Sequence, residues 1–145
     1  MASIEVENYK KSYEKIMDRW AKKVEKPLKE IEEINQELAT FDAKKGDLSD
    51  DDRKRQKDLL AQRQRCQAAI EKANLELKVD LMLIEPPTKA PQDEYKKLVD
   101  WIKGKIKKVQ DGLPLGGGFS LKPDVDFDFK KLKFKKQGVI LEWKF

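Results

Sequence analysis

Aspartates are the residues of this sequence whose type and spacing come closest to those of a metal site. Positions 50–52 are consecutive aspartates, and the segment 124–128 carries one at every second position. Carboxylate oxygens are the ligands that Ca²⁺ prefers in proteins. However, neighbouring side chains of a helix point away from one another, and lysines flank the second group closely enough to neutralise it. We therefore predict a helix start at the first group, a solvated strand face at the second, and no bound metal or cofactor.

A single cysteine, Cys66, and the absence of histidine exclude most nucleophilic and metal chemistry. Without histidine the chain cannot form a Ser-His-Asp site, a Cys-His site or a zinc site with histidine ligands. One cysteine cannot close an internal disulfide, and we predict a half-buried structural thiol. The glycine run 116–118 follows a helical segment and precedes a strand-like one, the reverse of the order in a phosphate-binding loop. We therefore predict no catalytic residues and a protein that is not an enzyme.

Charged residues dominate the composition. The 145 residues include 32 Lys+Arg and 27 Asp+Glu, so that 41% are charged and the formal net charge is +5; a soluble domain averages about 25% charged residues. The length fits one ordinary domain. The longest apolar run, 81–84, is far shorter than the ~20 residues of a membrane-spanning helix, and the first residues lack the pattern of a secretory signal. We expect a cytoplasmic protein, with export by a signal-free route left open.

Apolar residues recur every three or four positions along most of the chain, which is typical of long amphipathic helices. One such stripe runs through about 3–44 and a second through about 50–84. Pro27 predicts a kink near 23–27 or two helices end to end, because proline loses a backbone hydrogen bond and clashes with the preceding turn. Two helices of similar length joined by a short loop predict an antiparallel, coiled-coil-like hairpin over 1–85.

The loop and the far end of this hairpin carry local signals. Gly46 suits the end of the first helix, and Ser49 followed three residues later by Asp52 resembles a capping box at the start of the second. The segment 75–81 is ambiguous, because its apolar and polar residues alternate with the period of a strand. We favour a helix that continues to Ile84 and ends before the two prolines that follow.

A third amphipathic helix is expected within 86–112, with apolar residues on one face and lysines on the other. Gly112 is placed to end it. The basic face is a candidate surface for binding anions. Its lysines are Lys96, Lys97, Lys103, Lys105, Lys107 and Lys108.

The C-terminal region, 113–145, begins with a glycine-rich connector and continues with the alternating pattern of strands. We predict a β-hairpin with a bulge at 130–131 and a turn at 136–138, ending on the last residue. A lone hairpin is only marginally stable in water, so it must pack on the helices or on a partner. The predicted fold is therefore mainly α with some β (α+β): a long antiparallel helical hairpin, a third amphipathic helix and a C-terminal β-hairpin.

Large aromatic residues at both ends of the chain exceed what the seam between two helices can cover. This surplus predicts self-association or binding to another protein. We therefore expect a non-enzymatic protein–protein interaction module, such as an adaptor, an assembly factor or a small chaperone-like subunit, whose hairpin could add strands to a partner sheet. The candidate partner-binding residues are Tyr9, Tyr13, Trp20, Trp101, Trp143 and Phe145.

Two alternatives stay open at the level of sequence. The lysine face of the third helix, with Trp101 beside it, could bind the backbone of a nucleic acid or an anionic membrane. Salt would separate this alternative from the first, because phosphate-driven binding weakens steeply with salt whereas apolar docking hardly changes. The further alternative is a small toxin or effector without a conventional active site, which the amphipathic third helix and the glycine-rich hinge permit.

Overall fold

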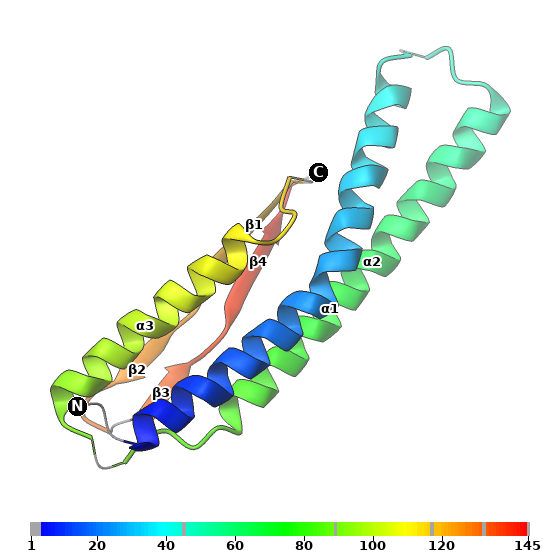
Figure 1. Ribbon diagram of the computed structural model, residues 1–145. Helices are drawn as coiled ribbons and strands as arrows, with labels where there is room; N and C mark the ends of the chain where they lie inside the picture. Colours follow the sequence, from blue (N-terminus) through cyan, green and yellow to red (C-terminus); the bar gives the residue numbers. More distant parts are fainter. Residues whose placement is uncertain (1–3, 45, 89, 117, 132, 145) are drawn as a thin grey trace.

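The protein consists of three helices and a long two-stranded β-ribbon (Figure 1). The computed structural model describes residues 4–44, 46–88, 90–116, 118–131 and 133–144. The predicted class, mainly α with some β, is confirmed. The helices are α1 (Ile4–Asp42), α2 (Asp50–Met82) and α3 (Gln92–Asp111).

α1 and α2 form the predicted antiparallel hairpin, with their connecting loop at one end of the molecule (Figure 1). α1 is one continuous helix that runs through Pro27, so the alternative of two helices end to end is wrong. The helix changes direction along its length (Figure 1), as expected where a proline removes a backbone hydrogen bond. α2 continues to Met82, with Leu83 as its C-cap, which shows that the ambiguous segment 75–81 is helical.

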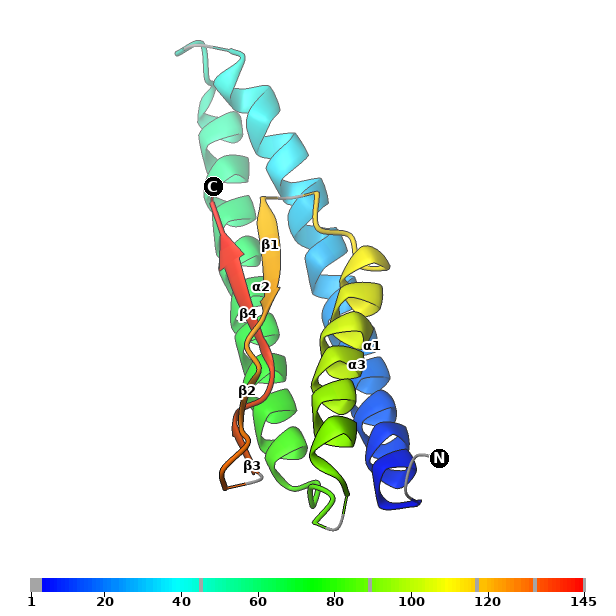
Figure 2. The same cartoon turned by 90° about the vertical axis from the view of Figure 1, so that its left-hand side faces the viewer.

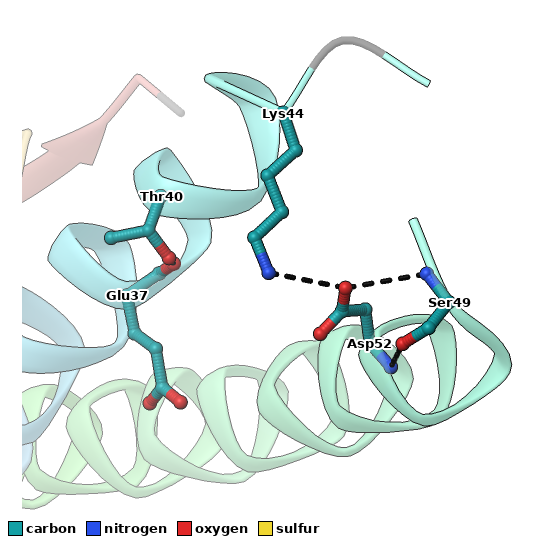
Figure 3. A network of polar contacts seen from close by, with 5 residues as sticks. All are labelled: Glu37, Thr40, Lys44, Ser49 and Asp52. Carbon is teal, nitrogen blue, oxygen red and sulfur yellow. Dashed lines mark hydrogen bonds and ion pairs between the residues drawn. The ribbon is translucent and has the colours of Figure 1, made fainter. Parts of the chain in front are cut away.

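The start of α2 has the predicted capping box (Figure 3). Ser49 Oγ accepts a hydrogen bond from the Asp52 backbone N–H at 3.1 Å, and the Asp52 carboxylate accepts one from the Ser49 N–H at 3.3 Å. Lys44 donates to the same carboxylate at 3.1 Å. The Lys44 hydrogen bond, together with the capping bonds, holds the pKa of Asp52 below its usual range. The loop therefore ties the end of α1 to the first turn of α2.

Replacing Ser49 with alanine is expected to lower the free energy of unfolding by about 1 kcal/mol, because the Asp52 N–H loses its acceptor. Urea denaturation followed by circular dichroism measures the change. Ser12→Ala, at an exposed position inside α1, is the matched control and should be neutral or slightly stabilising. A loss at Ser12 as large as the loss at Ser49 would contradict a capping role.

The pH dependence of the cap follows from the lowered pKa of Asp52. A group whose pKa is lower in the folded state stabilises the fold above its unfolded pKa, and that stabilisation is lost as the pH falls through the folded value. The difference in unfolding free energy between wild type and Asp52→Asn should therefore be present at neutral pH and shrink in acid.

α3 packs alongside the half of α1 that is distant from the hairpin loop (Figure 2). It buries Leu98, Ile102 and Ile106, and Gly112 forms its C-cap. The apolar face of α3 therefore belongs to the core of this chain. Within the described ranges, no helix is long and apolar enough to cross a membrane.

The C-terminal chain forms one ribbon of antiparallel strands. β1 (Phe119–Pro123) pairs with β4 (Val139–Trp143), and β2 (Asp126–Asp128) pairs with β3 (Lys133–Lys136). The hairpin turn therefore lies between β2 and β3, so the predicted turn at 136–138 is wrong. The predicted bulge is also misplaced, because the irregular register lies between the first two residues of β2.

Local hydrogen bonds explain where the turn forms. The Asp128 carboxylate accepts hydrogen bonds from the backbone N–H groups of Lys130 at 3.0 Å and Lys131 at 3.3 Å, which makes an Asx-type turn directly after β2. The segment predicted as a turn instead connects β3 to β4 along the same side of the ribbon. It stays paired with the opposite side, because the Asp124 N–H donates to the Gly138 carbonyl at 2.9 Å. Gly138 has a φ of 149°, a conformation that glycine adopts without a side-chain clash.

The ribbon closes the side of the fold that the helices leave open. In Figure 2 it runs between α2 and α3, with β4 toward α2 and β1 toward α3. Its buried Phe119 and Leu121 join one core with the inner faces of all three helices. The side chain of Gln110 in α3 donates to the Leu121 carbonyl. The ribbon thus packs on the helices of its own chain.

Candidate functional site

Three of the predicted partner-binding aromatics lie inside the core. Tyr9, Tyr13 and Trp20 are only 2%, 0% and 3% exposed. Trp20 Nε1 donates to the Asn74 side chain across the α1–α2 seam at 2.8 Å, and burial raises the pKa of both tyrosines. α3 and the ribbon cover the aromatic surface that two helices alone would expose. This corrects their assignment as binding residues, since they present no surface to a partner.

The other aromatic candidates are divided between the edge of the core and the end of the chain. Trp101 is half-buried, and its ring meets that of Tyr13 edge-on with 5.9 Å between centroids. Trp143 is half-buried and meets Phe119 edge-on at 6.0 Å. Phe145 lies outside the described residues. Trp101 and Trp143 therefore combine a core contact with partial exposure.

The predicted lysine face of α3 is exposed at five of its six positions. Lys105 differs, because its side chain is 15% exposed and its Nζ lies 3.1 Å from Glu14 and 3.2 Å from Asp18 of α1. Lys105 therefore belongs to the α1–α3 contact and not to the basic surface. The exposed lysines are Lys96, Lys97, Lys103, Lys107 and Lys108.

Cys66 has the surroundings of a structural thiol. It is 8% exposed and belongs to the core between α1 and α2, so it is more deeply buried than predicted. Its Sγ donates to Glu30 Oε2 at 3.2 Å. Burial, reinforced by the Glu30 carboxylate, raises the pKa of the thiol to about 11. The thiol is therefore protonated at neutral pH and is a poor nucleophile.

Three of the six aspartates in the two groups have polar contacts within the fold. Asp52 belongs to the capping box, Asp128 accepts the turn hydrogen bonds, and Asp124 lies 3.9 Å from Lys136 Nζ. No group of three potential ligand side chains that could hold a metal ion occurs among the residues that the structure describes.

A groove lies between α2 and the β3–β4 side of the ribbon. Its volume is about 990 Å³. Leu75 and Met82 of α2 lie on one wall, and Val139, Leu141 and Trp143 of β4 lie on the other. A concave site of this size with mainly apolar walls is typical of a binding site.

One wall of the groove continues into a second apolar face of α2, here called the α2 apolar face. Its members are Leu75 (66% exposed), Val79 (56%), Met82 (71%) and Leu83 (75%). Leu75, Val79 and Met82 follow one another at intervals of four and three residues, which places them on one side of the helix, and Leu83 is the C-cap beside them. The strand-like alternation in the sequence arises because Leu77 and Leu81, which are buried, stand between members of this face. That alternation was the signal of a two-faced helix, and the sequence reasoning did not identify it.

Lysines outnumber carboxylates around the groove. Four lysines against two carboxylates leave a surplus of two positive charges. Only Lys136 approaches one of the two carboxylates, at 3.9 Å from Asp124, within the described part of the chain. The charged lining residues are Glu71, Lys78, Asp124, Lys133, Lys135 and Lys136.

Gln137 is an uncharged polar residue in the lining of the groove. It lines the groove and is 9% exposed. Its Nε2 donates to the Tyr9 hydroxyl, but its Oε1 accepts no hydrogen bond from any described residue. A buried carbonyl oxygen without a donor favours a ligand that brings an N–H or O–H group.

The groove combines an apolar helix face, the outer strand of a ribbon and a surplus of lysine charge. Comparisons of the chain with protein-family models, curated proteins and solved structures found no match. The three features of the groove are therefore the basis for assigning a function.

Proposed function

We propose that this protein is a non-enzymatic protein–protein interaction module that binds a partner protein in the groove between α2 and β4. The α2 apolar face supports the proposal, because all four of its side chains are more than half exposed. Burying a leucine or methionine contributes about 1.5–3 kcal/mol, so association that covers this face is favoured. Single exposed apolar residues are ordinary on protein surfaces, but a contiguous group beside a groove marks an interaction site.

The walls of the groove are held in place by contacts within the chain. Beside Leu75, the Asn74 side chain accepts the hydrogen bond from Trp20. Glu76, which follows Leu75, forms an ion pair with Lys23 of α1, with 2.9 Å between Oε2 and Nζ. On the opposite wall, Gln137 is bonded to Tyr9. A site ordered before binding loses less conformational entropy when the partner docks, which increases affinity.

The double variant Leu75→Glu with Met82→Glu tests this proposal. Both side chains are exposed, so the free energy of unfolding should change by less than about 0.5 kcal/mol. Two charges in the groove should weaken association with a partner by at least about tenfold. Leu60→Glu, at a position of α2 that is 40% exposed and outside the groove, is the matched control.

The measurement is quantitative co-purification from the native source with wild type, the double variant and Leu60→Glu. The proposal expects proteins that wild type and Leu60→Glu retain and that the double variant loses. The same retained set in all three samples would overturn the groove as the binding site.

A second candidate function, binding to an anionic surface, has its own supporting observation. All five lysines in the segment 130–136 are exposed, at the tip of the ribbon. The tip lies near the start of α3, since the rings of Tyr95 and Phe127 stack with 5.4 Å between centroids. The exposed Lys96 and Lys97 directly follow Tyr95 in the chain. Retention on immobilised nucleic acid or anionic vesicles that falls steeply with salt would favour this candidate.

A toxin or effector that acts by inserting α3 is disfavoured, because the apolar face of that helix is covered by the core. A cytoplasmic location stays part of the proposal.

A further inference from the structure

The outer edge of β4 has backbone groups that point away from the ribbon. The Lys144 N–H donates to the Gly118 carbonyl, and the Asp124 N–H donates to the Gly138 carbonyl, at 3.0 and 2.9 Å. Hydrogen-bonded and non-hydrogen-bonded pairs alternate along an antiparallel ladder. The pairs that contain Val139, Leu141 and Trp143 are therefore the non-bonded ones, and the N–H and C=O groups of these residues point outward.

The opposite edge of the ribbon is protected. The outward carbonyl of Leu121 in β1 accepts the hydrogen bond from Gln110, and α3 lies beside this strand (Figure 2). Pro123 occupies another outward position of β1 and has no N–H to offer a neighbouring strand. β4 has no proline, and its outward residues line the groove that separates it from α2. Folded proteins usually cover or interrupt such an edge, so an open one beside an apolar groove indicates a site for another strand.

The groove has the size and lining for one extended segment. The five residues of β4 span roughly 17 Å, and a strand added beside them would lie about 4.8 Å away. Its side chains would alternate, so that one set meets Leu75 and Met82 on the α2 wall.

Charge decides what kind of segment fits. The lysine surplus around the groove favours a partner strand with acidic residues. A second copy of this chain would bring its own lysines, Lys133 and Lys135 among them, against the same surface, and like charges placed together oppose pairing. The favoured occupant is therefore a different protein.

We propose that the partner binds through an extended segment of alternating acidic and apolar residues, which adds to the outer edge of β4 as a third strand of the sheet. This inference rests on the proposed function, because it specifies how the groove is occupied. The new main-chain hydrogen bonds join Val139, Leu141 and Trp143 to the segment. Its apolar side chains cover Leu75 and Met82, and its carboxylates, on the other face of the segment, face Lys133 and Lys135 of β3.

A synthetic peptide of alternating glutamate and valine is the probe, titrated into the full-length protein. Fluorescence anisotropy of the labelled peptide should show saturable binding at least about tenfold tighter than that of an alternating lysine and valine peptide. Amide hydrogen exchange of Leu141 and Trp143 should slow when the peptide is present. The same glutamate–valine peptide with N-methylated amides should not bind, because it cannot form the strand hydrogen bonds.

Paired charge variants of the protein complete the test. Lys133→Glu with Lys135→Glu, in the groove lining, should weaken binding of the glutamate–valine peptide by about tenfold or more. Lys103→Glu with Lys107→Glu, on the exposed face of α3, is the matched control and should leave the affinity unchanged. An equal effect of both pairs would mean that the peptide responds only to net charge and would overturn the acidic-strand proposal.

The remaining outcomes separate this inference from the proposed function. Binding of the N-methylated peptide, or binding without slower exchange at β4, would refute strand addition while leaving the groove as a docking site. Slower exchange at β4 that depends on protein concentration without any peptide would show that a second copy occupies the edge. Failure of every acidic peptide to bind would refute the inference, whereas the Leu75 and Met82 double variant decides the proposed function separately.

Discussion

Trp20→Ala is expected to lower the free energy of unfolding by about 3–5 kcal/mol. Trp20 is 3% exposed in the seam between α1 and α2, so its removal leaves a cavity as well as less buried apolar surface. It also leaves Asn74 Oδ1 without the donor that lies 2.8 Å away in wild type. Because whole domains are stable by only about 5–15 kcal/mol, the variant should be close to unfolding at physiological temperature.

Urea denaturation followed by circular dichroism measures this loss. Trp20→Phe should recover most of it, since the ring still fills the seam and only the hydrogen bond, worth about 1 kcal/mol, is missing. Leu83→Ala, at a side chain that is 75% exposed, is the control and should change stability by less than about 0.5 kcal/mol. A Trp20→Ala protein of unchanged stability would contradict the burial of this residue and restore it as a candidate surface anchor.

Phe119→Ala should cost about 3–5 kcal/mol in stability, because the ribbon is part of the core. Phe119 is 7% exposed, lies against Trp143 and belongs to the same buried cluster as the helices. Ile140→Ala, on the paired strand β4, is the matched variant and should cost much less, because its side chain is 45% exposed.

The decisive measurement compares two probes of unfolding in each variant. Far-ultraviolet circular dichroism reports the helices, and amide exchange of β1 and β4 reports the ribbon. If the ribbon and helices share one core, Phe119→Ala should shift both transitions together. A variant in which the ribbon opens while the helices keep wild-type stability would show that the ribbon is a separate unit.

The helices were predictable because their signals are local. The apolar period of 3.6 residues and the capping residues Ser49 and Asp52 act within a few turns of chain, and both reappear in α1 and α2. The ribbon turn was harder to place, since Gly138 and the Asp128–Lys131 segment both carry turn residues. Hydrogen bonds of the Asp128 carboxylate to the Lys130 and Lys131 backbone decided between them.

The candidate site itself could not be predicted, because its walls come from segments far apart in the sequence. The helical period separates Leu77, which is buried, from Leu75, which is exposed two positions earlier, but it does not say which element lies beside the exposed side. That depends on how the ribbon docks next to α2. Tyr9 was misassigned for the same reason, since it is covered by Phe134 and Gln137 from the opposite end of the chain.

Periodicity, capping and composition can be read along the chain, and they were enough to predict the helical hairpin, the third helix, the α+β class and the lack of histidine chemistry. Which aromatic residues are buried, which edge of the ribbon is open and where lysines gather beside an apolar wall emerged from the packing of the elements. Burial and edge protection depend on that packing because they involve segments far apart in the sequence. Docking the ribbon between α2 and α3 covered the aromatic surplus and, in the same step, left β4 facing a groove.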